Sequence, residues 1–115
     1  MKKIEAIIRS SRFDEVKEAL SEKGINFFTF FEVKGYGHQK GKERKYRGTV
    51  YDVGYIARMK LEIFVSDSFV QPAIDAILAA AKTGEVGDGK IFISDVEEII
   101  QIRTGYKNET AINHV

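Results

Sequence analysis

The order of strand-like and helix-like periodicities constrains the fold of this chain more than any other feature. Apolar and polar residues alternate over residues 3–9 and 59–65, which predicts two strands with one buried face each. Residues 25–34 are apolar at both sets of alternate positions, so we expect a strand that is covered on both faces. The apolar run 91–93 predicts a further strand, and residues 99–103 predict a short fifth one.

Two segments between these strands have helical spacing instead. The first begins after a capping residue, Ser11, and ends at Gly24. Its apolar stripe consists of Phe13, Val16 and Leu20. The second begins near Ser68, and its stripe consists of Val70, Ile74, Ile77, Leu78 and Ala81. The order is therefore β-α-β-β-α-β, the ferredoxin-like arrangement of an α+β domain, followed by a polar tail that we expect to be mobile.

Length and composition indicate one domain. In a chain of 115 residues the core is modest, so association of several copies is a natural way to cover further apolar surface. The net charge of +1 gives no general attraction to nucleic acid or to anionic membranes. There is no cysteine, which excludes disulfides, and no apolar run as long as a signal peptide or a membrane span. We therefore expect a cytoplasmic protein without direct membrane insertion.

A glycine-rich loop joins the second predicted helix to the next strand, and its composition suits a phosphate cradle. Residues 84–89 contain three glycines, which let backbone N–H groups approach an anion closely, and Lys90 adds a positive charge. The loop differs from the P-loop pattern, because there a helix follows the lysine and here a strand is predicted. A plain helix-to-strand turn is the alternative, since Gly-Asp-Gly is common in turns.

A second unusual segment, residues 35–58, separates the second and third predicted strands. A hairpin needs only a few residues here, whereas this basic segment contains five of the ten glycines and four of the five tyrosines. Exposed tyrosines suit contact with a partner protein, and a solvated hairpin is the simpler alternative. RNA binding is disfavoured, because the third strand lacks the aromatic run of ferredoxin-like RNA-binding domains.

Three stretches of sequence together resemble the PII family of signal-transduction proteins. They are residues 32–41 (EVKGYGHQKG), 46–51 (YRGTVY) and 83–92 (TGEVGDGKIF), the last followed by Ile102-Arg103-Thr104-Gly105. The resemblance implies one PII-like domain over residues 1–115 and a homotrimer of ferredoxin-like subunits, with a nucleotide site in each of the three clefts between neighbours. The implied loops are a T-loop over 36–57, a B-loop over 83–90 and a C-terminal loop over 104–115.

The resemblance also implies that ATP and ADP bind competitively at named positions. Adenine and ribose would be packed by Ile7, Thr29, Glu62 and Phe64. The phosphates would be held by Gly87, Asp88, Gly89 and Lys90 and, at the base of the T-loop, by Gly37, His38 and Gln39. The site would be completed by Gln101 and by Arg103, the latter from the adjacent subunit.

The family's effectors and modification have implied positions as well. Gln39 would bind Mg²⁺ through its carbonyl oxygen, a ligand that suits a hard cation. In the family this Mg²⁺ chelates 2-oxoglutarate, which would contact Gln39, Lys40 and Arg58. Tyr51 keeps the hydroxyl that some members use as a uridylylation acceptor, and direct contact of this tyrosine with a partner is the alternative.

Several positions depart from the family pattern. His38 and Gln101 stand where arginine is usual, which removes two fixed positive charges near the phosphates. Arg58 replaces the usual lysine, and these cations are not interchangeable at a tight site. Thr49 and Val50 also differ from the residues usual there.

The implied function is that of a regulator rather than an enzyme. It would control a protein target, such as an ammonium or other transporter or a metabolic enzyme, through the T-loop in nitrogen regulation. The departures favour an alternative, a divergent energy sensor that reads adenylates only, does not respond to 2-oxoglutarate and serves another metabolic system. A slow ATPase is disfavoured, because no residue near Lys90 is an obvious general base, although Asp88 is a candidate.

Overall fold

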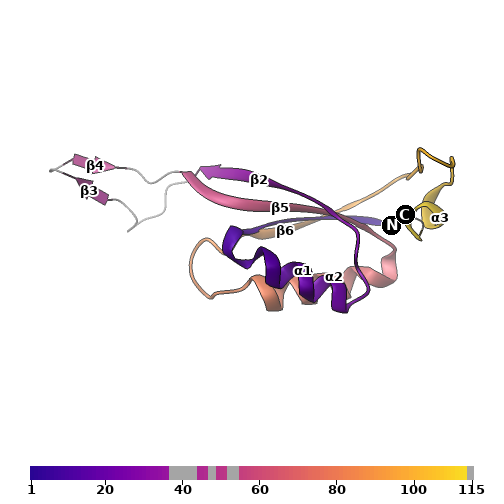
Figure 1. The fold of residues 1–115 in the computed structure, drawn as a ribbon, viewed down its shortest axis with the longest axis horizontal. Coiled ribbons are helices and arrows are strands. Elements are labelled where there is room, and N and C mark those ends of the chain that lie inside the picture. The colour runs from indigo at the N-terminus through magenta and orange to yellow at the C-terminus, as the bar shows by residue number, and fades with distance from the viewer. Residues whose placement is uncertain (37–43, 47–48, 52–54, 114–115) are drawn as a thin grey trace.

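A four-stranded antiparallel sheet with two helices on one face forms the body of the chain (Figure 1). The computed structural model describes residues 1–36, 44–46, 49–51 and 55–113. The strands of the sheet are β1 (Lys2–Arg9), β2 (Thr29–Tyr36), β5 (Tyr55–Val65) and β6 (Lys90–Asp95), and the helices are α1 (Phe13–Glu22) and α2 (Val70–Ala81). The strand order β2-β5-β1-β6 makes β2 and β6 the two edges. The predicted ferredoxin-like α+β fold is confirmed.

Smaller elements complete the described chain. The 3-10 turns η1 (Ser10–Arg12) and η2 (Asp67–Phe69) lead into α1 and α2, and a short helix, α3 (Asn108–Asn113), lies near the C-terminus. The strands β3 (Arg44–Tyr46) and β4 (Thr49–Tyr51) pair as a separate hairpin beyond the end of the sheet (Figure 1).

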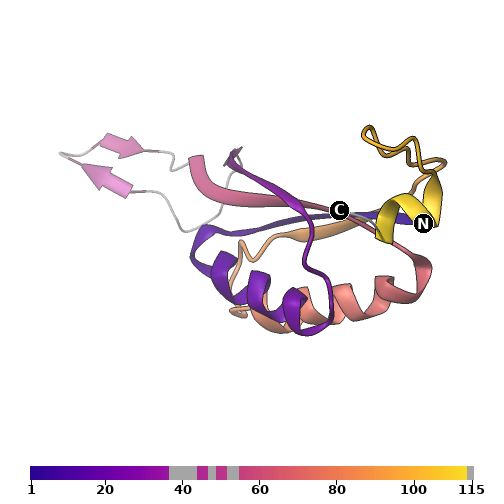
Figure 2. The ribbon, with the colours of Figure 1, turned by 45° about the vertical axis from the view of Figure 1, so that its right-hand side comes forward.

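The core lies between the sheet and the two helices, and the strand alternation places it there. Every second residue of β1 is fully or almost fully buried, as are the alternate residues of β5 that pair beside them. The core side chains of β1 and β5 are Ile4, Ala6, Ile8, Met59, Leu61, Ile63 and Val65, and those of the helices are Val16, Leu20, Ala73, Ala76, Ile77 and Ala81. The opposite face of the sheet carries neither α1 nor α2 (Figure 2). We call it the open face.

The ends of the helices follow the sequence only in part. Gly24 adopts a φ of +79°, and its N–H donates to the carbonyl of Ser21 at 2.9 Å, so the predicted end of α1 is confirmed. The predicted cap at Ser11 is wrong, because no side chain caps α1 and a 3-10 turn leads into the helix. In α2, three alanines take most of the buried positions, and Leu78, which was predicted to be buried, is exposed.

The aromatic strand is shorter than predicted and is not covered on both faces. Residues 25–28 form no ladder, and β2 begins at Thr29. Phe30 and Phe31 point to opposite faces, and both are exposed in the single chain. The strand β2 is therefore an edge strand with exposed apolar side chains on both faces among the described residues.

The C-terminal segment corrects two predictions. No strand forms over 99–103; only an isolated bridge joins Ile100 to Lys107, because the chain reverses between them. Gly105 supplies a φ of +75° for this reversal, and the N–H of Gln101 donates to the carbonyl of Tyr106 at 2.8 Å. The tail that was expected to be a mobile loop contains α3.

Both ends of the segment between the second and third predicted strands belong to paired strands of the sheet. Pairing of β2 with β5 continues to Tyr36 opposite Tyr55, so the ends of the predicted loop 36–57 belong to strands. The hairpin β3-β4 lies within the rest of it.

Candidate functional site

The glycine-rich loop is closed by the carboxylate of Asp88. This carboxylate accepts hydrogen bonds from the backbone N–H groups of Thr83 and Gly84, at 2.8 and 2.9 Å, and from the Thr83 hydroxyl. The side chain therefore acts within the loop, where it folds residues 83–88 into a compact turn. The sequence placed Asp88 at the phosphates; the structure gives its carboxylate this additional, structural role.

Arg9, at the end of β1, ties the loop to the sheet. Its Nε donates to Asp88 at 3.0 Å, and its Nη2 donates to the carbonyl of Val86 at 2.8 Å. One guanidinium thus bonds both a side chain and the backbone of the loop, which the planar arrangement of its donors allows. The Thr83 hydroxyl, the Arg9 guanidinium and the backbone N–H of Thr83 hold the pKa of the Asp88 carboxyl well below its usual range.

Gly89 allows the loop to pass close to β1. Its φ is +98°, and a Cβ built on it would lie 1.7 Å from the backbone carbonyl oxygen of Ile7. No other residue type fits there without moving β1 or the loop. The contact places Lys90, the first residue of β6, directly opposite Ile7 in the ladder.

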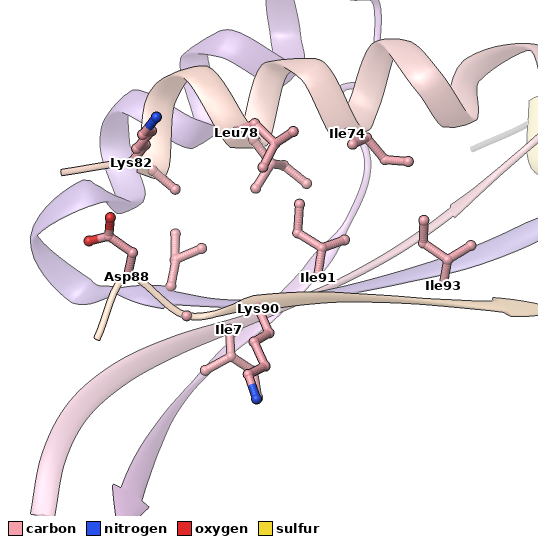
Figure 3. A pocket seen from close by; sticks show the side chains of 12 residues that line it. Ile7, Ile74, Leu78, Lys82, Asp88, Lys90, Ile91 and Ile93 are labelled. Carbon is pink, nitrogen blue, oxygen red and sulfur yellow. The ribbon is translucent and has the colours of Figure 1, made fainter. Parts of the chain in front are cut away.

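The side chains of Lys90 and Ile7 point to the open face, away from the apolar groove beside α2 (Figure 3), although both residues, with Asp88 and Gly89, belong to the lining of this groove. This groove, of about 450 Å³, is lined mainly by aliphatic side chains, among them Leu78, Ile91 and Ile93. It does not have the polar character of a phosphate site. The predicted phosphate residues that precede and begin β6 lie beside Ile7 of β1, and we call Ile7, Gly87, Asp88, Gly89 and Lys90 the loop group.

Three of the predicted adenine and ribose residues lie on the edge strand β2 and its neighbour β5. Thr29 pairs with Glu62, and both line a hollow of about 430 Å³ together with Phe64. The other lining residues are Phe27, Phe28, Val96, Glu98, Ile99, Ala111 and Ile112. We call this the aromatic hollow. Of the predicted adenine and ribose residues only Ile7 lies elsewhere, in the loop group.

A cluster of alternating charges on β1 and β5 adjoins both the loop group, where Ile7 pairs with Lys60, and the aromatic hollow, which Glu62 lines. Its members are Lys3, Glu5, Lys60 and Glu62. Lys60 and Glu5 are 2.8 Å apart, whereas Lys3 and Lys60 lie 3.6 and 3.7 Å from Glu62. The hydrogen bond between Lys60 and Glu5 raises the pKa of Lys60 and lowers the pKa of Glu5. The pairing keeps these four charges on the open face without a net charge.

Arg58 connects the start of β5 with the loop group. It lies opposite Arg9 in the ladder and is only 8% exposed, and its Nη1 has no hydrogen-bond partner among the residues the structure describes. Burial, and then the neighbouring Arg9, lower the pKa of this guanidinium, while Asp88 acts in the opposite direction. Arg58 is therefore a buried cation near the start of β5, close in sequence to the end of the long segment that follows β2.

The remaining predicted residues divide into two sets. Gln101 and Arg103 lie in the C-terminal reversal, at the opposite end of the molecule from the loop that precedes β6 (Figure 1). The hydroxyl of Thr104 donates to the Gln101 side chain at 2.5 Å. The T-loop predictions Gly37, His38, Gln39 and Lys40 lie outside the described residues. Tyr51 ends β4, and its side chain is likewise outside them.

Comparison with known proteins matches this chain to one family over nearly its whole length. The sequence profile of the family described as Nitrogen regulatory protein P-II matches residues 1–106. Proteins named Nitrogen regulatory protein P-II are 54% identical in Nostoc punctiforme and in Azospirillum brasilense, and 52% identical in Pasteurella multocida. Each alignment covers 97% of this chain and all of the relative.

The chain belongs to the P-II family. The resemblance in its three sequence stretches is thereby confirmed, as are signal transduction and nitrogen regulation as the field in which the family acts. P-II proteins are signalling proteins rather than enzymes. Among the described residues, no helix has the length and apolar character needed to cross a bilayer.

Sequence reasoning missed three groups around the candidate P-II site. The sequence did not single out Arg9, because its partner Asp88 lies 79 positions away. The charged cluster required the register of β1 against β5, which alternation alone does not give. Phe27 was counted as part of a strand, whereas it precedes β2 and its side chain is exposed.

The loop geometry predicts that Gly89 and Gly84 differ in their tolerance of a side chain. Both have positive φ, so alanine strains the backbone at either position by about 1–3 kcal/mol. Only at Gly89 would the new Cβ also meet backbone, whereas it meets nothing within 4 Å at Gly84. Gly89→Ala should therefore lower the free energy of unfolding, measured in denaturant at fixed protein concentration, clearly more than Gly84→Ala. Equal effects would contradict the close approach of the loop to β1.

The low pKa of Asp88 predicts a contribution to stability that depends on pH. An acid whose pKa falls on folding stabilises the native state above its unfolded pKa, near 4, and loses this contribution as the pH falls further. Stability of the wild type should therefore fall more steeply between pH 5 and pH 2 than stability of Asp88→Asn, in parallel denaturant titrations. Asp14→Asn, at a side chain that is 90% exposed, is the matched control and should follow the wild type. Parallel curves for Asp88→Asn and the wild type would contradict the bonding described for Asp88.

Proposed function

We propose that this chain is a P-II signal-transduction protein that binds ATP and ADP in competition at a site shared between neighbouring copies. The observation that carries the proposal is the spread of the predicted nucleotide residues across one sheet, from Lys90 on the edge strand β6 to Thr29 on the opposite edge strand β2. Lys90 of the loop group begins β6, whereas Thr29, Glu62 and Phe64 of the aromatic hollow lie on β2 and β5. Three strand spacings of about 4.8 Å each separate the strand of Lys90 from the strand of Thr29.

Contact between the β6 edge of one copy and the β2 edge of the next would bring the two groups together. It would also cover Phe31 and the other apolar side chains that a single chain leaves exposed on β2. A closed ring of such contacts leaves no edge open, and a homotrimer with three nucleotide sites is the assembly we propose. Arg103, which lies far from Lys90 within one chain, would reach the phosphates from the neighbouring copy.

The charges of the two groups support an orientation in which the phosphates meet the loop group and the adenine and ribose meet the aromatic hollow. In the loop group, Lys90 and the backbone N–H groups of Gly87 and Gly89 suit phosphate oxygens. The Asp88 carboxylate is already bonded within the loop, so its charge is balanced by Arg9 rather than directed at the ligand. The aromatic hollow would receive the adenine and ribose, with Thr29 and Glu62 as its polar groups.

Signalling would follow from coupling between the nucleotide and the T-loop. Mg²⁺ and the γ-phosphate would engage Gln39, one conformer of the T-loop would be favoured, and a protein target would bind that conformer better. Such coupling is reciprocal, so the target should also change nucleotide affinity. The target we propose is a transporter, such as an ammonium transporter, or a metabolic enzyme in the cytoplasm. Tyr51 would contact it or be uridylylated.

Arg58 bears on whether the sensor also responds to 2-oxoglutarate. Its buried guanidinium, with one nitrogen unpartnered among the described residues, suits a carboxylate held with Lys40 and the Mg²⁺ on Gln39. The alternative is a sensor of adenylates alone that serves another metabolic system. His38 and Gln101, which replace two arginines, favour it. Calorimetry with Mg²⁺-ATP separates the two, because only the first shows tighter nucleotide binding when 2-oxoglutarate is present.

The proposed phosphate contacts predict that Lys90→Ala and Arg103→Ala each weaken ATP binding at least tenfold. Loss of a charged hydrogen-bond partner costs about 1.5–3 kcal/mol, and 1.4 kcal/mol is a factor of ten. Isothermal calorimetry with ATP, ADP and AMP measures the effect, and Lys17→Ala, on the exposed side of α1, is the matched control. Unchanged ATP affinity in both variants would refute the phosphate site.

A further inference from the structure

The aromatic hollow contains a phenylalanine that neither the family resemblance nor the comparisons assign to any role. Phe27 is 70% exposed, more than any other of the eight phenylalanines. It lines the hollow together with Phe64, which is 43% exposed, and both rings also border a smaller adjoining hollow of about 110 Å³. Two exposed aromatic rings at one concave surface are suited to a flat, apolar ligand surface.

The backbone around Phe27 holds it in place without including it in the sheet. It precedes β2 and therefore belongs to no ladder. On one side Ile25 is buried in the core, and on the other Phe28 packs edge-on against Phe13, with 6.4 Å between ring centroids. Phe27 thus lies between two anchored residues, so its ring is presented to the hollow at little further entropic cost on binding.

The charges of the hollow select which part of a nucleotide it would accept. Its lining contains the carboxylates of Glu62 and Glu98 and, among the described residues, no basic side chain. Phosphate is therefore disfavoured there, whereas a base with an exocyclic amine is favoured. Glu62 keeps acceptor capacity for such an amine, because Lys3 and Lys60 stay 3.6 Å and 3.7 Å from it, beyond normal hydrogen-bond length.

We propose that Phe27 is a nucleotide-binding residue that stacks on the nucleobase, with Phe64 as the neighbouring wall of the hollow. The inference rests on the proposed function and adds Phe27, a lining residue of the aromatic hollow, to the proposed nucleotide site. Stacking on aromatic side chains is a general way to bind a base. It gives the adenine end of the nucleotide an anchor that is independent of the phosphate contacts at Lys90.

The chain contains no tryptophan, which allows a direct test of stacking. In Phe27→Trp the new indole is the only one, and ATP should quench its fluorescence while inorganic triphosphate, which lacks the base, should not. Phe30→Trp is the matched control, because Phe30 lies three residues further on and packs against Phe13 instead. Its emission should not respond to ATP.

Affinity measurements complete the test. Phe27→Ala should weaken ATP binding about tenfold, within the range for loss of one base-stacking contact, and leave the affinity for inorganic triphosphate unchanged. Light scattering of each variant confirms that the assembly persists. An unaltered ATP affinity in Phe27→Ala with no quenching in Phe27→Trp overturns the stacking role and leaves the proposed function standing. Equal loss for ATP and triphosphate, or loss of the assembled mass, also overturns it. Failure of the wild type to bind ATP or ADP overturns both proposals.

Discussion

The bond between Asp88 and Arg9 is the interaction on which the rest of the site depends. Asp88 gathers Thr83 and Gly84 around its carboxylate, and Arg9 attaches this compact loop to the end of β1. The attachment brings the backbone of Gly89 against β1 and directs Lys90 into the first position of β6. Without it, three glycines in six residues would have little to offset the entropy of ordering them, and the N–H groups proposed to bind phosphate would have no defined direction.

The same interaction links the loop to the part of the molecule that would signal. Arg58 lies opposite Arg9 in the ladder and is buried near Asp88. It stands near the start of β5, which follows the long segment after β2. A ligand that changes the charge around the loop group therefore changes the environment of a buried cation at the root of that segment. This gives the proposed sensor a short physical connection between nucleotide and T-loop, through side chains that touch or repel one another directly.

Sequence reasoning predicted what depends on local periodicity and missed what depends on pairing across the chain. The alternation in β1 and the stripe in α1 identified Ile4 and Leu20 as core residues, and Gly24 marked the helix end. Residues 99–103 read as a strand because apolar and polar residues alternate there, yet the tight reversal at Gly105 leaves Ile102 fully exposed. The family resemblance supplied a set of nucleotide residues, but only the order of the strands shows that they are spread across the sheet, from Thr29 on one edge strand to Lys90 on the other.

The central claim is that two copies of the chain complete each nucleotide site, and mixed assemblies test it most directly. Subunits carrying Lys90→Ala still supply Arg103, and subunits carrying Arg103→Ala still supply Lys90. After the two variants are co-assembled, some interfaces contain both native residues. The account predicts that the mixture regains a fraction of high-affinity ATP sites that neither variant has alone. No recovery, with mixed assembly demonstrated by native mass spectrometry, would mean that each site lies within one chain and would contradict the account.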